Sequence, residues 1–155
     1  MLKTMLLSGA AALCFAVPAF AEIEIHDSYA RAATPNSKTG AAFMMIHNKG
    51  GEADRLVSAS SAAAARVELH THLEDANGVM KMMHVEEGFA LPTDGEIAMK
   101  RGGKHVMLMG LTQGLNHGDA ISITLTFENA GDITVEVPVD LERQDHATMS
   151  HGSDS

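Results

Sequence analysis

Residues 66–82 read RVELHTHLEDANGVMKM, and this stretch decides how the fold is interpreted. Apolar and polar residues alternate over residues 66–72, a pattern typical of a β-strand with one buried face. Asn77-Gly78 is a strong signal for a hairpin turn, because both residues tolerate the backbone conformations that tight turns need. We therefore expect a second strand at residues 79–82, folded back beside the first.

The rest of the chain repeats this pattern of short strands and turns. Turn residues cluster at residues 48–51, 102–103 and 131–132. Many short strands with turns roughly every 8–12 residues are typical of a β-sandwich or barrel, so we expect one all-β domain of about eight to nine strands. Besides the hairpin, strands are expected at residues 23–26, 41–47, 96–101, 104–109, 120–128 and 132–139, with a short helical turn at residues 58–65.

The N-terminus has the features of a secretory signal peptide. Lys3 gives a positive start, residues 5–20 are apolar or small, and Ala19-Phe20-Ala21 fits the A-x-A cleavage pattern. The apolar run is shorter than the roughly 20 residues of a membrane-spanning helix, and the residues before Cys14 do not make a lipobox. We therefore expect residues 1–21 to be removed, leaving a periplasmic protein without a membrane span.

Composition limits what the mature chain can do. Cleavage after Ala21 would remove Cys14, the only cysteine, so neither a thiol nor a disulfide would remain. Without Lys3, 10 basic residues stand against 20 acidic ones, which disfavours nucleic acid and anionic membranes as partners. Methionine and histidine are the enriched types, since all nine His and nine of the 11 Met follow residue 21.

Two segments combine these residue types at alternate positions. The hairpin carries His70 and His72 before its turn and Met80 and Met82 after it, while residues 105–109 read HVMLM. Residues i and i+2 of a strand share a face, so His105 and Met107 point the same way. A strand holding them beside the hairpin would complete a cluster of imidazoles and thioethers.

Such a cluster suits Cu(I). Thioether sulfur is soft and neutral, so it favours Cu(I) over Mg, Ca or Zn. It needs no deprotonation and cannot be lost to a disulfide in an oxidising periplasm. The alternative interpretation is that the methionines fill the core and the histidines lie at the surface. Two His/Met segments in an exported chain without thiols favour copper.

At these residues the sequence resembles the periplasmic copper chaperones of the PCu(A)C family, over nearly the whole mature domain. The most specific motifs are residues 78–82 (GVMKM) and 102–111 (GGKHVMLMGL), with further matches at residues 27–31, 48–56, 67–70, 125–127 and 130–131. The resemblance implies a cupredoxin-like β-sandwich or barrel with a surface-exposed Cu(I) site of two His and two Met. It also implies copper delivery to the CuA centre of cytochrome c oxidase.

Local context within these motifs assigns the ligands as His70, Met82, His105 and Met107. The family's spacing is His, ten residues, Met, twenty-one residues, His-x-Met, whereas here eleven and twenty-two residues intervene. A literal count selects His72 and Met83 instead. Local context is preferred because hairpin loops vary by one residue, and because Met83 faces away from Met82. His72, Met80 and Met83 remain alternatives to His70 and Met82.

The expected function is that of a Cu(I) chaperone that takes copper from a donor protein and passes it to an acceptor. The acceptor is expected to be cytochrome c oxidase subunit II or a second assembly chaperone. Copper buffering or resistance is the alternative, and a structural β-sandwich without metal would leave the His/Met pattern unexplained. A blue-copper carrier would need a cysteine thiolate. No enzyme is expected, since G-x-S-x-G, H-E-x-x-H and paired-carboxylate signatures are absent from the sequence.

The domain is expected to span residues 22–142 and the polar tail residues 143–155. The tail carries His146, Met149 and His151. These are either incidental residues of a solvated extension or a flexible second arm that captures copper, including Cu(II) through imidazole.

Overall fold

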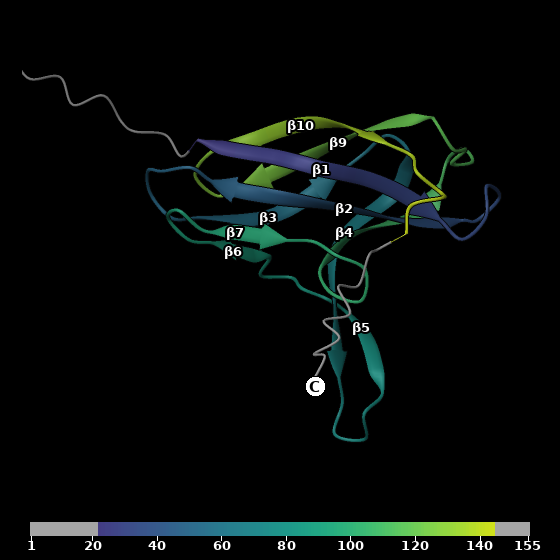
Figure 1. The fold of residues 1–155 in the computed structure, drawn as a ribbon, viewed down its shortest axis with the longest axis horizontal. Helices are drawn as coiled ribbons and strands as arrows, with labels where there is room; N and C mark the ends of the chain where they lie inside the picture. Colours follow the sequence, from purple (N-terminus) through teal and green to yellow (C-terminus); the bar gives the residue numbers. More distant parts are fainter. Residues whose placement is uncertain (1–21, 145–155) are drawn as a thin grey trace, which may run out of the picture.

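The computed structural model describes residues 22–144, and all the regular elements in that range are β-strands (Figure 1). The expected all-β fold is confirmed, with ten strands rather than eight to nine. The signal peptide expected at residues 1–21 and tail residues 145–155 lie outside the described residues. The strands are β1 (Ile23–Ala32), β2 (Thr39–Asn48), β3 (Asp54–Ser60), β4 (Ala64–Glu74), β5 (Met80–His84), β6 (Phe89–Leu91), β7 (Glu96–Ala98), β8 (His105–Leu111), β9 (Ala120–Phe127) and β10 (Gly131–Pro138).

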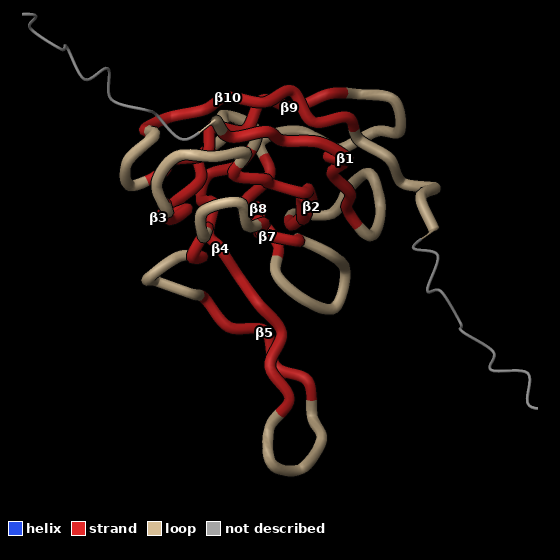
Figure 2. Tube along the Cα trace, turned by 60° about the vertical axis from the view of Figure 1, so that its left-hand side comes forward, coloured by secondary structure: helices blue, strands red, loops and turns tan. Residues whose placement is uncertain are grey.

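These strands form two sheets (Figure 2). In the first sheet the order is β1-β2-β8-β4-β5, with β7 also paired to β2; in the second the order is β10-β9-β3-β6. The buried residues alternate along the strands, as Ile121, Ile123 and Leu125 do in β9, so each sheet turns one apolar face to the other. The β-sandwich is therefore the arrangement that buries both apolar faces.

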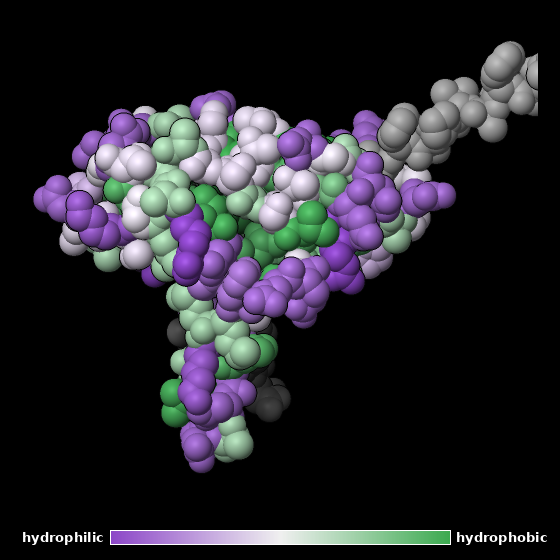
Figure 3. All heavy atoms as spheres, turned by 180° about the vertical axis from the view of Figure 1, so that it is seen from behind, coloured by the Kyte–Doolittle hydropathy of each residue, from purple (hydrophilic) through white to green (hydrophobic). Residues whose placement is uncertain are grey.

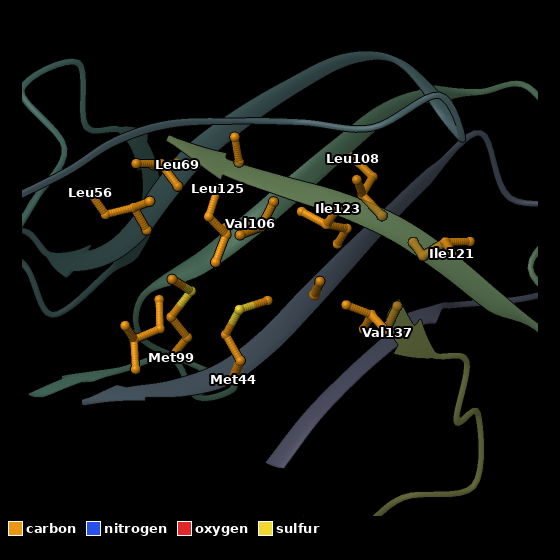
Figure 4. Close-up of a cluster of buried hydrophobic side chains, with 14 of the residues drawn as sticks. Met44, Leu56, Leu69, Met99, Val106, Leu108, Ile121, Ile123, Leu125 and Val137 are labelled. Carbon is orange, nitrogen blue, oxygen red and sulfur yellow. The ribbon is translucent and has the colours of Figure 1, made fainter. Parts of the chain in front are cut away.

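Some methionines do fill the core. Met44 and Met99 are almost fully buried and pack among aliphatic side chains such as Val106, Leu108 and Ile123 (Figure 4). A flexible thioether chain fills irregular gaps between branched side chains. Buried methionines such as Met44 and Met99 therefore serve core packing, whereas exposed methionines are available for other roles.

The helical turn expected at residues 58–65 is wrong. Strand β3 continues to Ser60, and β4 begins at Ala64 after a short turn. The Ser- and Ala-rich sequence has little intrinsic preference for a strand, yet β3 pairs with β9 on one side and β6 on the other. This pairing buries Leu56 completely, so tertiary context overrides local propensity.

The predicted hairpin is confirmed, and it extends from the body of the sandwich. Strand β8 pairs with β4 only as far as His70, whereas β5 pairs with β4 from His70 to Glu74. Residues 71–84, which we call the arm, therefore project beyond the sheet (Figures 1 and 2). The Asp75 carboxylate accepts hydrogen bonds from the backbone N–H groups of Asn77 and Val79 and closes the turn.

Ordered contacts at the C-terminus reach Arg143, one residue past the expected domain end. Its guanidinium binds both carboxylate oxygens of Asp27, at 2.7 and 2.8 Å, and lies 4.2 Å from the centre of the Tyr29 ring. Arg31 donates a longer hydrogen bond, 3.4 Å, to the Arg143 carbonyl. The segment after β10 is thus fixed across β1. No helix among the described residues is long and apolar enough to cross a membrane.

Candidate metal site

The register of three strands brings the predicted donors to one face of the first sheet. His70 stands opposite His105 of β8 on one side and His84 of β5 on the other. His72 stands opposite Met82, and Glu68 stands opposite Met107. Directly opposed residues of antiparallel strands project from the same face. We call His70, His72, Met82, His105 and Met107 the His/Met cluster.

His105 is the most buried member of the cluster, with 2% of its surface exposed. Its Nδ1 lies 2.9 Å from the carbonyl oxygen of Gly103. A carbonyl can only accept, so Nδ1 carries the proton and Nε2 keeps its lone pair. Burial lowers the pKa of His105, against the opposing effect of the Gly103 hydrogen bond, and the nearby His72 and His70 lower it further. The ring is therefore a neutral imidazole, the form that binds metals.

His70 is held by Glu68 of the same strand. Its Nε2 donates a hydrogen bond of 2.8 Å to one carboxylate oxygen of Glu68, while the Arg66 guanidinium lies 2.9 Å from the other oxygen. The hydrogen bond from His70, and then the charge of Arg66, lower the pKa of Glu68. The carboxylate therefore stays ionised, and it fixes the His70 proton on Nε2.

Three imidazole nitrogens of the cluster are buried without a hydrogen-bond partner: His70 Nδ1, His72 Nδ1 and His105 Nε2. Within residues 22–144 these are the only buried side-chain nitrogen or oxygen atoms of that kind. The ring centres of His70 and His72 lie 5.8 and 5.3 Å from that of His105. Buried polar atoms are normally satisfied, so this concentration of unpartnered imidazole nitrogens indicates a ligand.

A hollow of about 360 Å³ is lined by His72 and His105, which carry two of these three nitrogens. It is lined by His72, Met82, His105 and Met107 on the donor side, and by Phe43, Arg31, Arg101 and small residues elsewhere. Three of the four predicted ligands thus meet at the hollow, whereas His70 lies outside its lining. Two thioethers beside two imidazoles form a donor set that favours Cu(I).

The alternatives to the predicted ligands occupy different places. Met80 lies on the same face as Met82 but farther out on the arm, opposite Glu74, while Met83 pairs with Thr71 and projects from the other face. Met80, Met82 and Met83 are each exposed over about half of their surface. Figure 3 shows hydrophobic and hydrophilic side chains together on the surface of the arm. Of the three alternatives, His72 lines the hollow, whereas Met80 and Met83 do not.

Sequence reasoning missed Glu68. It is not a soft donor, so a search for histidine and methionine passes over it. The alternation of the strand could have found it, because Glu68 lies two residues before His70 and therefore on the same face. Within residues 22–144, no three His, Cys, Asp or Glu side chains are placed to hold a metal by themselves.

Comparison with known proteins places this chain in a family. The family model described as "Putative lipoprotein LpqE-like" matches residues 23–139. The chain is 34% identical over 117 residues to "Putative lipoprotein Lxx21020" of Leifsonia xyli subsp. xyli, which covers 76% of this chain and 69% of that protein.

Two copper-bound structures share the fold. The copper-bound PCuAC domain from PmoF2 superposes with a TM-score of 0.62 at 26% identity, over 77% of this chain and 92% of that chain. Cu(I)-bound DR1885 from Deinococcus radiodurans superposes with a TM-score of 0.60 at 29% identity, over 76% and 77%. The cupredoxin-like fold and the similarity to PCuAC domains that the sequence motifs predicted are both confirmed.

Proposed function

Because the chain belongs to the LpqE-like family and gathers imidazoles and thioethers on one sheet face, we propose that it is a Cu(I) chaperone of the cell envelope. The observation that carries this proposal is the set of three buried, unpartnered imidazole nitrogens in the His/Met cluster, two of them on residues that line a hollow with Met82 and Met107. The copper-bound PCuAC domain from PmoF2 and Cu(I)-bound DR1885, which have the same fold, support copper as the cargo.

The proposed ligands are His70, Met82, His105 and Met107. Metal-binding histidines usually donate their second ring nitrogen to a carboxylate or a backbone carbonyl, which fixes the tautomer. His105 does so to Gly103, and His70 does so to Glu68. His72 makes no hydrogen bond to another described residue, although it lines the hollow. This difference favours His70 as the second imidazole ligand.

The exposure of the site supports a role in copper delivery. Met82 is 46% exposed and belongs to the arm, while His105 is buried in the body. An incoming ligand can displace a neutral, exposed thioether such as that of Met82 first. The buried imidazole of His105 would be the last donor to release the copper ion. We propose that the acceptor, which supplies the incoming ligand, is cytochrome c oxidase subunit II or a second assembly chaperone.

The proposed compartment is the periplasm, reached through the signal peptide at residues 1–21. The matched family and its Leifsonia relative carry the word lipoprotein in their names, which supports a location in the cell envelope. The mass of the mature protein tests this part: cleavage before Glu22 leaves an unmodified N-terminus, whereas lipidation would require cleavage before Cys14 and an added lipid.

The test of copper binding is a titration with Cu(I) under anaerobic conditions against a competing chelator. We expect one tightly bound Cu(I) per chain and no intense visible band of the kind that thiolate–copper sites give. Met107→Ala should weaken binding about tenfold or more. Met109→Ala is the matched control, because Met109 shares the strand and the face but does not line the hollow. Unchanged affinity in Met107→Ala would contradict the proposed site.

The test of delivery is the phenotype of cells that lack the protein. We expect poor cytochrome oxidase activity when copper is scarce and recovery when copper is added. Normal oxidase activity at low copper, together with sensitivity to excess copper, would instead identify a buffering protein.

A further inference from the structure

Glu68 lies at the centre of a chain of contacts beside the His/Met cluster, on the same face of the sheet. Its Oε2 accepts the 2.8 Å hydrogen bond from His70 Nε2 and lies 3.7 Å from His84 Nδ1. Its Oε1 lies 2.9 Å from Arg66 Nε. Only 16% of the Glu68 side chain is exposed, so protein groups rather than water occupy both carboxylate oxygens. The orientation of this carboxylate is therefore fixed from both sides.

A fixed carboxylate determines the chemistry of the His70 ring. An ionised carboxylate can only accept hydrogen bonds, so the proton of neutral His70 must sit on Nε2. Nδ1 then carries the lone pair, and this is the atom that the structure leaves buried and unpartnered. In the other tautomer, the lone pair of Nε2 would face the negative carboxylate and Nδ1 would have no lone pair to offer. Only one of the two tautomers is useful for binding metal here.

The two proposed imidazole ligands thus carry their protons on different ring nitrogens and offer different nitrogens to a metal. His105 is fixed with its proton on Nδ1 by a backbone carbonyl and offers Nε2, whereas His70 is fixed with its proton on Nε2 and offers Nδ1. A backbone carbonyl cannot be removed by a side-chain substitution. The His70 anchor is a single side chain, so its contribution can be measured.

We propose that Glu68 is a positioning residue of the copper site, which holds the His70 ring and its tautomer so that Nδ1 is ready to bind Cu(I). This inference rests on the proposed function only for its effect on copper. The tautomer itself exists before any metal arrives. Partners that hold metal-binding histidines typically contribute 10- to 100-fold to affinity, so we expect Glu68→Ala to weaken Cu(I) binding by roughly that factor.

The experiment combines two measurements on the full mature chain. Nitrogen-15 NMR of the metal-free protein reads the tautomer of each histidine, and chelator competition gives the Cu(I) affinity. In the wild type we expect His70 with its proton on Nε2 and His105 with its proton on Nδ1. In Glu68→Ala we expect His70 to become a mixture of tautomers, while His105 stays unchanged and reports that the sheet is intact.

Two further variants separate positioning from a general effect of charge or folding. Glu68→Gln keeps a carbonyl oxygen that can accept from Nε2, so it should restore most of the tautomer preference and part of the affinity. Glu74→Ala removes a carboxylate from the same face of β4, where no contact with a cluster imidazole exists, and should change neither measurement.

The outcomes are distinct. A pure Nε2–H tautomer of His70 in Glu68→Ala, with wild-type affinity, would overturn the positioning role. If the proton of His105 also left Nδ1 in the same variant, the positioning role would be overturned too, because the substitution would then have disrupted the sheet. If the wild-type protein failed to bind Cu(I), the proposed function would fall, while the tautomer measurement would still decide the role of Glu68.

Discussion

His72 and Met82 stand directly across from each other in the ladder between β4 and β5. The hydrogen bonds that close the arm's turn set this pairing, and it places an imidazole and a thioether side by side at the mouth of the hollow. His72 Nδ1 is buried and has no partner, and the ring centre lies 5.3 Å from that of His105. The cluster therefore has one imidazole more than the proposed ligand set.

We expect this extra imidazole to act in copper exchange. His72→Ala should change the Cu(I) affinity by less than about threefold, because His70 and His105 are the fixed imidazoles. It should slow removal of copper by a chelator, since a donor within the hollow is lost. Stopped-flow mixing of loaded protein with the chelator gives the rate. His70→Ala is the comparison and should lose about tenfold or more in affinity. The opposite order of affinities would assign His72 as the ligand.

Acidification should weaken Cu(I) binding. Imidazoles bind metal only when neutral, so protons compete with copper below the pKa of each ligand histidine. Burial lowers the pKa of His105, so protons displace copper from this ligand only at a lower pH than from an ordinary histidine. The measurement is the affinity between pH 8 and pH 5. His105→Met replaces a titrating donor with a thioether, and its affinity should fall less steeply with pH. An equally steep fall would show that His105 is not a ligand.

Gly88 should be the glycine that tolerates alanine least. It has a φ of 72°, and a Cβ there would lie 2.0 Å from the carbonyl oxygen of Leu56 in β3. Gly102 is a matched control, because its φ is 79° but no atom lies within 4 Å of the place that a Cβ would take. We expect Gly102→Ala to cost about 1 kcal/mol in the free energy of unfolding. Gly88→Ala should cost more than about 2 kcal/mol. Urea unfolding of both variants checks this, and equal losses would contradict the clash.

Truncation should separate the tail from the domain. A chain ending at Gln144 keeps Arg143 on Asp27 and Tyr29, so its fold and its Cu(I) site should match the full chain. Loss of His146 and the other tail donors should lower the total uptake of Cu(II). Copper per chain, measured after equilibration with each ion, gives the result. A weaker Cu(I) site in this truncation would make the tail a ligand donor.

A chain ending at Glu142 should behave differently. It loses the Arg143 contacts and should be less stable by about 1 kcal/mol, as expected for one partly exposed ion pair with a cation–π contact. Thermal unfolding of the two truncations side by side measures this difference. Equal stability would show that the contacts of Arg143 contribute nothing to the fold.

Alternation and turn residues were enough to predict an all-β sandwich or barrel and the shared face of His105 and Met107. The period of two determines which side chains share a face, whatever the neighbouring strands are. Strand β3 could not be predicted in the same way, because Ser58, Ala59 and Ser60 become part of a strand only through pairing with β9.

The choice between His70 and His72 was open in the sequence for a different physical reason. The segment between His70 and Met82 is one residue longer than the family's spacing. The sequence does not show whether the extra residue lies in the turn or shifts the pairing of the two strands by one residue. Here the backbone N–H of Gly78 donates to the Asp75 carbonyl, and Gly78 has a φ of 78°. This turn puts Met82 opposite His72. The hydrogen bond from His70 to Glu68 is equally invisible to a search for donor types, although it decides which nitrogen His70 offers.

Within the arm, the end of β4 and strand β5 pair with each other, and β5 has no other neighbour because it is the edge strand of its sheet. His105 and Met107 belong to β8 in the body. A copper ion bound by Met82 together with these two residues would cross-link the arm to the body of the sandwich. Loaded and empty molecules would then differ in the stiffness of the arm as well as in their cargo. An acceptor that touches the arm could thereby distinguish a full carrier from an empty one before any ligand is exchanged.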